Sequence, residues 1–144
     1  MVIVMIQILG AFFAVAGFAL VLGIPGKFTV YTGATGAVGW MVYLFSEAVM
    51  DSVVLASFFS AVVIAVISQI LARVFKAPVT LFIIAAMMTL VPGAGMYRIV
   101  YYALQGDSAR MSFYVIQTLE IAGAIAVAIF LADSVFRLNS VKKN

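Results

Sequence analysis

The sequence predicts an all-α fold: a polytopic membrane protein with about five transmembrane segments in a single domain over residues 1–144. Of the 144 residues, 67% are hydrophobic and 9% are charged, and the mean hydropathy is +1.28. A chain this apolar has too few polar side chains to cover a water-soluble domain. Apolar runs long enough to cross a bilayer as helices recur along it, and one of them is interrupted near its middle. The predicted segments are about 2–22, 28–45, 53–74, 79–104 and 112–136.

The first segment is interpreted as a retained transmembrane helix. Gln7 is its only strongly polar side chain, and such an amide usually forms a hydrogen bond with a neighbouring helix. Although Ala14-Val15-Ala16 is similar to a signal-peptide cleavage site, no basic residue precedes the apolar run, and the run continues beyond that site. Pro25 and Gly26 then predict a tight turn to the second segment.

The second segment carries a face of glycines. Gly33, Gly36 and Gly39 recur at three-residue spacing. Small residues on one face let another helix approach closely, so these glycines are candidates for packing against a helix of a partner protein. Packing against a helix of the same chain is an equally good interpretation.

Charged residues predict the loops and the orientation. Residues 46–51 contain Glu47 and Asp51 without any basic residue, which is typical of an external loop. Cytoplasmic loops carry an excess of Lys and Arg. The preferred arrangement therefore has the N-terminus outside, the C-terminus in the cytoplasm and Arg110 on the external side; if segment 28–45 does not cross, the bias is weaker. The basic residues on its cytoplasmic side are Lys27, Arg73, Lys76, Arg137, Lys142 and Lys143.

The fourth segment predicts a helix in two pieces. Pro92 lacks a backbone donor and disfavours helix in the residue before it, and Gly93 and Gly95 can adopt backbone angles closed to other residues. Irregular backbone within a bilayer is tolerated where it is buried in protein or lines a watery cavity. The interruption therefore predicts a discontinuous helix beside a cavity.

The second half of this helix, expected to begin near Met96, is the candidate substrate site. Its free N–H groups and positive dipole end would face the interruption, with Arg98 about one turn inside. Together they would bind an anion such as a substrate carboxylate. The alternative is a kink made for packing, with Arg98 paired to an internal acid such as Glu120. The candidate substrate-binding residues are Pro92, Gly93, Gly95, Tyr97 and Arg98.

The last segment contains a carboxylate in an apolar environment. Glu120 lies in its first half, where a charge is costly unless it is paired, protonated or facing water. Glu120 could neutralise Arg98, relay a proton, or do both at different stages of transport. Glu120, and Asp107 in the turn before this segment, are the candidate coupling or ion-binding residues.

The composition argues against several classes of function. The chain has no cysteine and no histidine, which excludes disulfides, thiolate metal sites and the usual proton shuttle. A Ser or Thr nucleophile would lack an imidazole base, and the five acidic residues form no metal motif. We therefore expect no enzyme, no metal site and no cofactor. The net charge of +3 indicates membrane topology and not nucleic-acid binding.

Two stretches resemble the signature of the threonine/serine exporter (ThrE) family. One is Leu71-Ala72-Arg73 leading to Lys76-Ala77-Pro78, and the other is Leu90-Val91-Pro92-Gly93-Ala94-Gly95-Met96-Tyr97-Arg98 followed by Gly106-Asp107. The match is to the small C-terminal half of the family and is similar to a separately encoded, YjjB-type subunit. Thr89 stands where a proline is expected in many relatives, which predicts a less sharp break.

The resemblance implies one subunit of a two-component secondary exporter, driven by an ion gradient, in the bacterial inner membrane. It implies a larger subunit as partner and a small carboxylated metabolite as cargo, either threonine or serine or a dicarboxylate such as succinate. The residues leave the cargo, the coupling ion and the stoichiometry open. Two other functions remain: a non-transporting membrane scaffold organised by the glycine face, and a homo-oligomeric channel.

Overall fold

The computed structural model describes residues 1–141, and the side chains as far as Leu138, as six α-helices without a strand. Lys142 and Lys143, which the charge count places in the cytoplasm, lie outside the described residues. The helices are α1 (Val2–Val21), α2 (Gly26–Met50), α3 (Val53–Phe75), α4 (Thr80–Met87), α5 (Gly93–Leu104) and α6 (Ser108–Val141).

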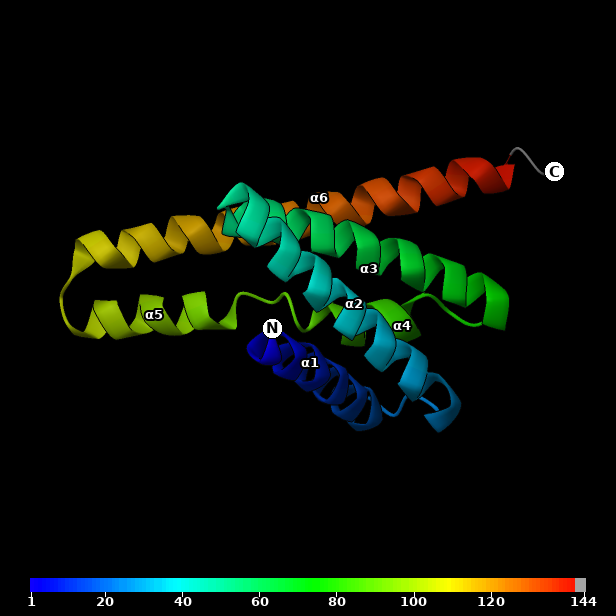
Figure 1. Cartoon of the computed structure of the whole chain (residues 1–144). Helices are drawn as coiled ribbons and strands as arrows, with labels where there is room; N and C mark the ends of the chain where they lie inside the picture. Colours follow the sequence, from blue (N-terminus) through cyan, green and yellow to red (C-terminus); the bar gives the residue numbers. More distant parts are fainter. Residues whose placement is uncertain (142–144) are drawn as a thin grey trace.

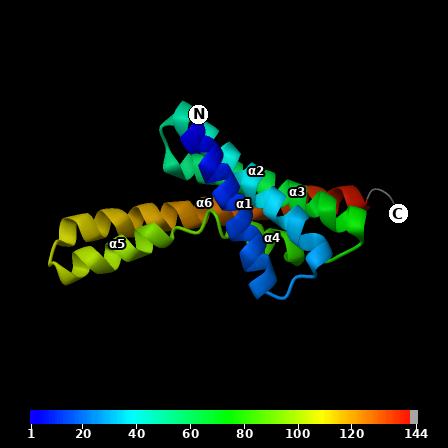
Figure 2. The same ribbon diagram turned by 60° about the horizontal axis from the view of Figure 1, so that its bottom comes forward.

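The helices form a packed bundle with one projecting arm (Figure 1). Helices α1 and α2 are antiparallel neighbours, and α3 packs against both α2 and α6. The short helix α4 lies among α1, α2 and α3. Helix α5 runs back along the N-terminal half of α6, and this pair extends away from the other helices, as the turned view also shows (Figure 2).

The apolar core is built around α4. Phe82, Ala85 and Ala86 have no exposed surface, and they belong to one cluster with residues of α1, α2, α3 and α6. Burial of these side chains removes apolar surface from the surrounding medium and fixes the end of α4. The chain that leaves α4 therefore starts from a rigid position.

Three helices are long and apolar enough to cross a membrane: α1, α3 and, over Ser108–Leu138, α6. Helix α2 has 25 residues, which exceeds the roughly 20 that a bilayer requires, but it is less apolar. The finding is consistent with a polytopic membrane protein. Five spans, with α4 and α5 forming one discontinuous span, stay a prediction.

Helix α2 is longer than the sequence predicts. It continues to Met50, so Ser46 and Glu47 are helical and do not lie in a loop. No residue between 46 and 50 interrupts a helix, whereas Asp51 ends it with a left-handed φ of 49°. Ser52 then caps α3 by accepting a hydrogen bond from the Leu55 N–H at 3.3 Å.

The fourth predicted segment contains two helices separated by residues 88–92. Helix α5 begins at Gly93, three residues before the expected start near Met96, with Pro92 as its N-cap. Proline suits a helix start because its φ is already near the helical value and its missing N–H would be unsatisfied there. Gly93 and Gly95 are not among the positive-φ residues, so the special glycine angles expected at this break are not used.

The glycine face of α2 packs within the chain. A Cβ at Gly36 would lie 2.5 Å from Val15 of α1, and a Cβ at Gly39 would collide with Ile64 of α3; Gly33 faces Phe12 of α1. The hydroxyl of Ser60 on α3 donates a buried hydrogen bond of 2.6 Å to the Gly39 carbonyl. Of the two interpretations of these glycines, packing against helices of the same chain is the one observed.

Candidate functional site

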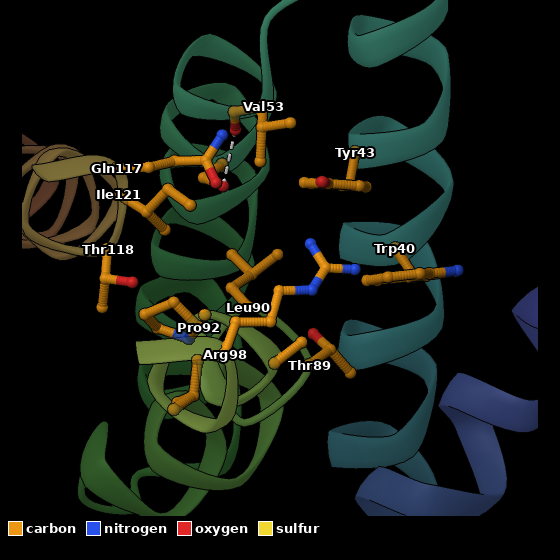
Figure 3. Close-up of a pocket in the computed structure, with 14 residues that line it drawn as sticks. Trp40, Tyr43, Val53, Thr89, Leu90, Pro92, Arg98, Gln117, Thr118 and Ile121 are labelled. Atoms are coloured by element: carbon orange, nitrogen blue, oxygen red, sulfur yellow. Dashed lines mark hydrogen bonds between the residues drawn. The ribbon is translucent and has the colours of Figure 1, made fainter. Parts of the chain in front are cut away.

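The interruption between α4 and α5 borders a cavity of about 340 Å³. Its wall comes from α2, α3, the 88–92 connection, α5 and α6, so four helices and the non-helical stretch converge on it (Figure 3). The volume lies within the range of about 300–1,000 Å³ that is usual for small-molecule sites. The lining residues are Trp40, Tyr43, Val53, Ser57, Thr89, Leu90, Val91, Pro92, Ala94, Gly95, Arg98, Gln117, Thr118 and Ile121.

Arg98 is the only charged residue among those that line the cavity. Its side chain extends from α5 across the cavity toward Trp40 of α2 (Figure 3). The guanidinium carbon lies 5.2 Å from the centre of the Tyr114 ring on α6, a cation–π contact. Among the described residues, the ion pairs are Arg110–Asp107 and Arg137–Asp133, and neither involves Arg98. The pairing of Arg98 with Glu120 that the sequence left open is absent from these pairs.

The N-terminus of α5 opens onto the same cavity. Ala94 and Gly95, in the first turn of this twelve-residue helix, line the wall, and no side chain caps that end. The first backbone N–H groups of a helix have no partner within it, and the helix dipole is positive there. The guanidinium and the helix end thus contribute positive potential to one space.

Neutral polar groups complete the wall. Ser57 donates its hydroxyl hydrogen to the Val53 carbonyl at 2.8 Å (dashed in Figure 3), and Thr89 donates to the Ala86 carbonyl at 3.0 Å. Each hydroxyl oxygen keeps lone pairs that can accept a hydrogen bond from a ligand. With Gln117 beside them, the cavity offers donors and acceptors but contains no carboxylate among its lining residues.

The predicted substrate residues separate into two groups. Pro92, Gly95 and Arg98 line the cavity, whereas Gly93 and Tyr97 do not. Tyr97 is 70% exposed and stacks on Tyr101, with 6.1 Å between ring centres. The structure therefore brings together Pro92, the backbone of Gly95 and the Arg98 side chain, but not Tyr97.

The predicted coupling residues are not among those that line the cavity. Glu120 is on an exposed face of α6, to the side of Gln117 and Thr118. Asp107 accepts a hydrogen bond of 3.0 Å from the Arg110 N–H, which makes it the cap of α6, and its carboxylate lies 3.4 Å from Nε of Arg110. No group of acidic residues within the described part of the chain could hold a metal ion.

Several lining residues were not predicted from the sequence. Trp40 and Tyr43 of α2 stack with 4.9 Å between ring centres and 10° between planes, and they face Arg98. Ser57 and Thr118 are polar residues within apolar helices, and both are buried. Trp40 is the one tryptophan in the chain, so its uniqueness was the available signal.

Comparison with known families gives a match that covers most of the chain. Residues 7–135 match the family model described as Threonine/Serine exporter, ThrE. No curated protein and no solved structure matches the chain.

Proposed function

Because the chain belongs to the threonine/serine exporter family, we propose that it is the small subunit of a two-component secondary exporter that binds its cargo at Arg98. The cargo is a small carboxylated metabolite, either threonine or serine or a dicarboxylate such as succinate. The single observation that carries this proposal is a guanidinium that projects into a cavity without an ion-pair partner among the described residues.

The chemistry of the cavity supports a carboxylate ligand. A guanidinium presents N–H groups in a planar fork that matches two carboxylate oxygens. The backbone N–H groups at the start of α5 lie on the same wall and favour negative charge. Tyr43, Ser57 and Gln117 can then hydrogen-bond the hydroxyl or second polar group of the cargo.

The outer surface of the α5–α6 arm supports a partner chain. Leu104 is 85% exposed and Leu119 is 67% exposed, and Glu120 lies beside Leu119 on an exposed part of α6. A carboxylate on an apolar helix is stabilised when it faces water or a polar partner instead of lipid. We infer that a larger subunit covers this arm and that Glu120 serves coupling at that boundary.

Membrane placement follows from the same proposal. Helices α1, α2, α3 and α6 would each cross the bilayer, and α4 with α5 would form the discontinuous fourth span. The bias of basic residues favours an N-terminus outside and a C-terminus in the cytoplasm of a bacterial inner membrane. In this arrangement the cavity at residues 88–92 lies within the membrane, where a broken helix can line a substrate path.

The glycine face that motivated a scaffold function is occupied by α1 and α3. A scaffold function would therefore lack an open glycine face on which to pack another protein. A homo-oligomeric channel has its own test, because the purified chain alone would conduct ions in a planar bilayer.

The proposal is tested by efflux of labelled threonine, serine and succinate. Cells express the chain alone or together with the larger subunit encoded beside it, and efflux is expected to require both. Arg98→Ala should reduce efflux at least tenfold without a change in abundance, which corresponds to about 1.4 kcal/mol of lost binding free energy, and Arg98→Lys should recover part of it.

Arg110→Ala is the matched control. Arg110 is an exposed arginine in the first turn of α6. Its surface ion pair with Asp107 is of a kind that contributes little to folding stability. Normal efflux by an Arg98→Ala complex of undiminished abundance would contradict the proposal.

A further inference from the structure

A groove between α3 and the C-terminal half of α6 is lined by apolar side chains. Its volume is about 310 Å³, and three of its side chains stay exposed: Phe59 at 40%, Leu131 at 47% and Val135 at 56%. The groove is therefore open to whatever surrounds the bundle, and for a membrane-spanning helix pair the surroundings are lipid acyl chains. The lining residues are Phe58, Phe59, Val62, Val66, Leu131, Ala132, Val135 and Phe136.

A guanidinium lies at one end of this groove. Arg73 comes about two helical turns after Val66 on α3, so the two side chains share a face. The guanidinium carbon lies 4.6 Å from the centre of the Phe136 ring, which itself lines the groove, and Nη2 donates a hydrogen bond of 2.9 Å to the Phe136 carbonyl. These contacts hold the cation at the end of the groove that contains Phe136.

The charges around Arg73 are mainly positive. Lys76 is the C-cap of α3, and Arg137 of α6 has a side chain that is 81% exposed. The acidic residue nearest to them in the sequence is Asp133, whose carboxylate forms an ion pair of 2.8 Å with Nε of Arg137. Three cations against one carboxylate leave this end of the groove positive.

We propose that the groove binds one phospholipid of net negative charge, with an acyl chain along the apolar side chains and the phosphate on Arg73. A guanidinium can donate two parallel hydrogen bonds to phosphate oxygens. Basic pockets between transmembrane helices on the cytoplasmic side are known to take anionic headgroups. The bias of basic residues assigns Arg73, Lys76 and Arg137 to that side.

The shape and charge of the groove match a lipid, which has an apolar chain and an anionic head. The larger subunit is proposed to cover the arm that α5 forms with the N-terminal half of α6, whereas the groove lies on the C-terminal half (Figures 1 and 2). The two surfaces are therefore at different ends of α6. The lipid site depends neither on the cargo nor on Arg98.

The test is a lipid titration of the full-length chain, purified in an uncharged detergent and depleted of lipid. Native mass spectrometry counts bound phosphatidylglycerol, or phosphatidylcholine with the same acyl chains, and phosphatidylglycerol is expected to bind more tightly. Arg73→Gln should weaken phosphatidylglycerol binding about fivefold, which is the usual effect of one basic residue at an anionic lipid surface. Arg73→Lys keeps the charge without the planar fork, so its loss should be smaller.

A second variant tests the groove separately from the charge. Val135→Trp fills the groove and keeps every charged residue, so it should weaken binding of phosphatidylglycerol. Leu138→Trp is its control, because Leu138 is 70% exposed and does not line the groove. Arg110→Gln is the control for Arg73→Gln: its guanidinium carbon also lies near a ring, 5.4 Å from the centre of Tyr102, but at the other end of α6.

The binding affinities decide the proposal. Weaker phosphatidylglycerol binding in Arg73→Gln and in Val135→Trp, but not in Arg110→Gln or Leu138→Trp, supports the lipid site. Equal affinity for the two lipids, or unchanged binding in Arg73→Gln, overturns it. Loss in Arg73→Gln with unchanged binding in Val135→Trp would place the headgroup on the surface and overturn the groove.

Two further outcomes are also decisive. Release of the bound phosphatidylglycerol when the larger subunit is added would assign the groove to that subunit and overturn the lipid site. If Arg73→Gln does not accumulate, Arg73→Lys and Val135→Trp provide the comparison, and unchanged phosphatidylglycerol binding in both would overturn the proposal.

Discussion

Gly95 of α5 lies directly against the hydroxyl of Thr118 on α6. A Cβ at position 95 would collide with Thr118 Oγ1, and both residues line the Arg98 cavity. Helix α5 packs on α6 and on no other helix of the described chain. The contact of these two residues therefore sets the distance between the helices and, with it, the position of Arg98.

Gly95→Ala is expected to separate α5 from α6 and to impair efflux. Inserting a methyl group into a packed contact usually costs about 1–3 kcal/mol, so the thermal midpoint of the detergent-solubilised protein should fall. Adding Thr118→Ala removes the colliding hydroxyl and should restore the midpoint.

Gly123→Ala is the control for this prediction. Gly123 is also helical, but a Cβ there would meet nothing within 4 Å, so no loss of stability is expected. A Gly95→Ala protein as stable as Gly123→Ala would show that the contact does not determine helix spacing.

Gly39→Ala is expected to destabilise the bundle, because its Cβ would occupy the position of Ile64. The loss should appear as lower abundance and a lower thermal midpoint in the absence of any partner. Gly17→Ala, with nothing within 4 Å of its Cβ, should leave both quantities unchanged. If Gly39→Ala lowered abundance and the thermal midpoint only when a partner protein is present, the glycine face would instead pack against that partner.

Ser60→Ala is expected to weaken the contact between α2 and α3. It removes the 2.6 Å hydrogen bond from Ser60 to the Gly39 carbonyl, and bonds between membrane helices contribute about 0.6 kcal/mol on average. Chemical unfolding in micelles measures the change. Ser134→Ala removes an exposed bond within α6 and should have a smaller effect; the reverse order would contradict the proposed role of Ser60.

Asp107→Ala is expected to destabilise the start of α6 by about 1 kcal/mol, the usual cost of losing an N-cap. Asp107→Ser retains an acceptor for the Arg110 N–H and should restore stability without restoring the charge. Hydrogen exchange of the first turn of α6 measures both. If Asp107→Ser is stable but efflux loses its dependence on the ion gradient, Asp107 also has the coupling role that the sequence suggested.

The apolar composition and the Pro-Gly run were sufficient to predict helices, the interruption near residue 92 and Arg98 beside it. These features are local, because proline and glycine act on their own backbone and arginine carries its charge in any environment. Helix α5 begins at Gly93, three residues before the predicted start, because Pro92 favours a helix start and neither Gly93 nor Gly95 adopts a positive φ. Helix α2 continues through Glu47, where the sequence predicts a loop, because polar residues at 46 and 47 do not by themselves end a helix.

Residue types and their spacing within single stretches are enough to indicate the class of protein, the family and the cation at the interruption. The surroundings of that cation follow from the packing of the helices. Trp40, Ser57 and Thr118 come from three helices far apart in the chain and meet at Arg98 because α4 anchors the connection and bare glycines let the helices close on one another. Such convergence depends on packing between distant segments, which no single stretch of sequence encodes.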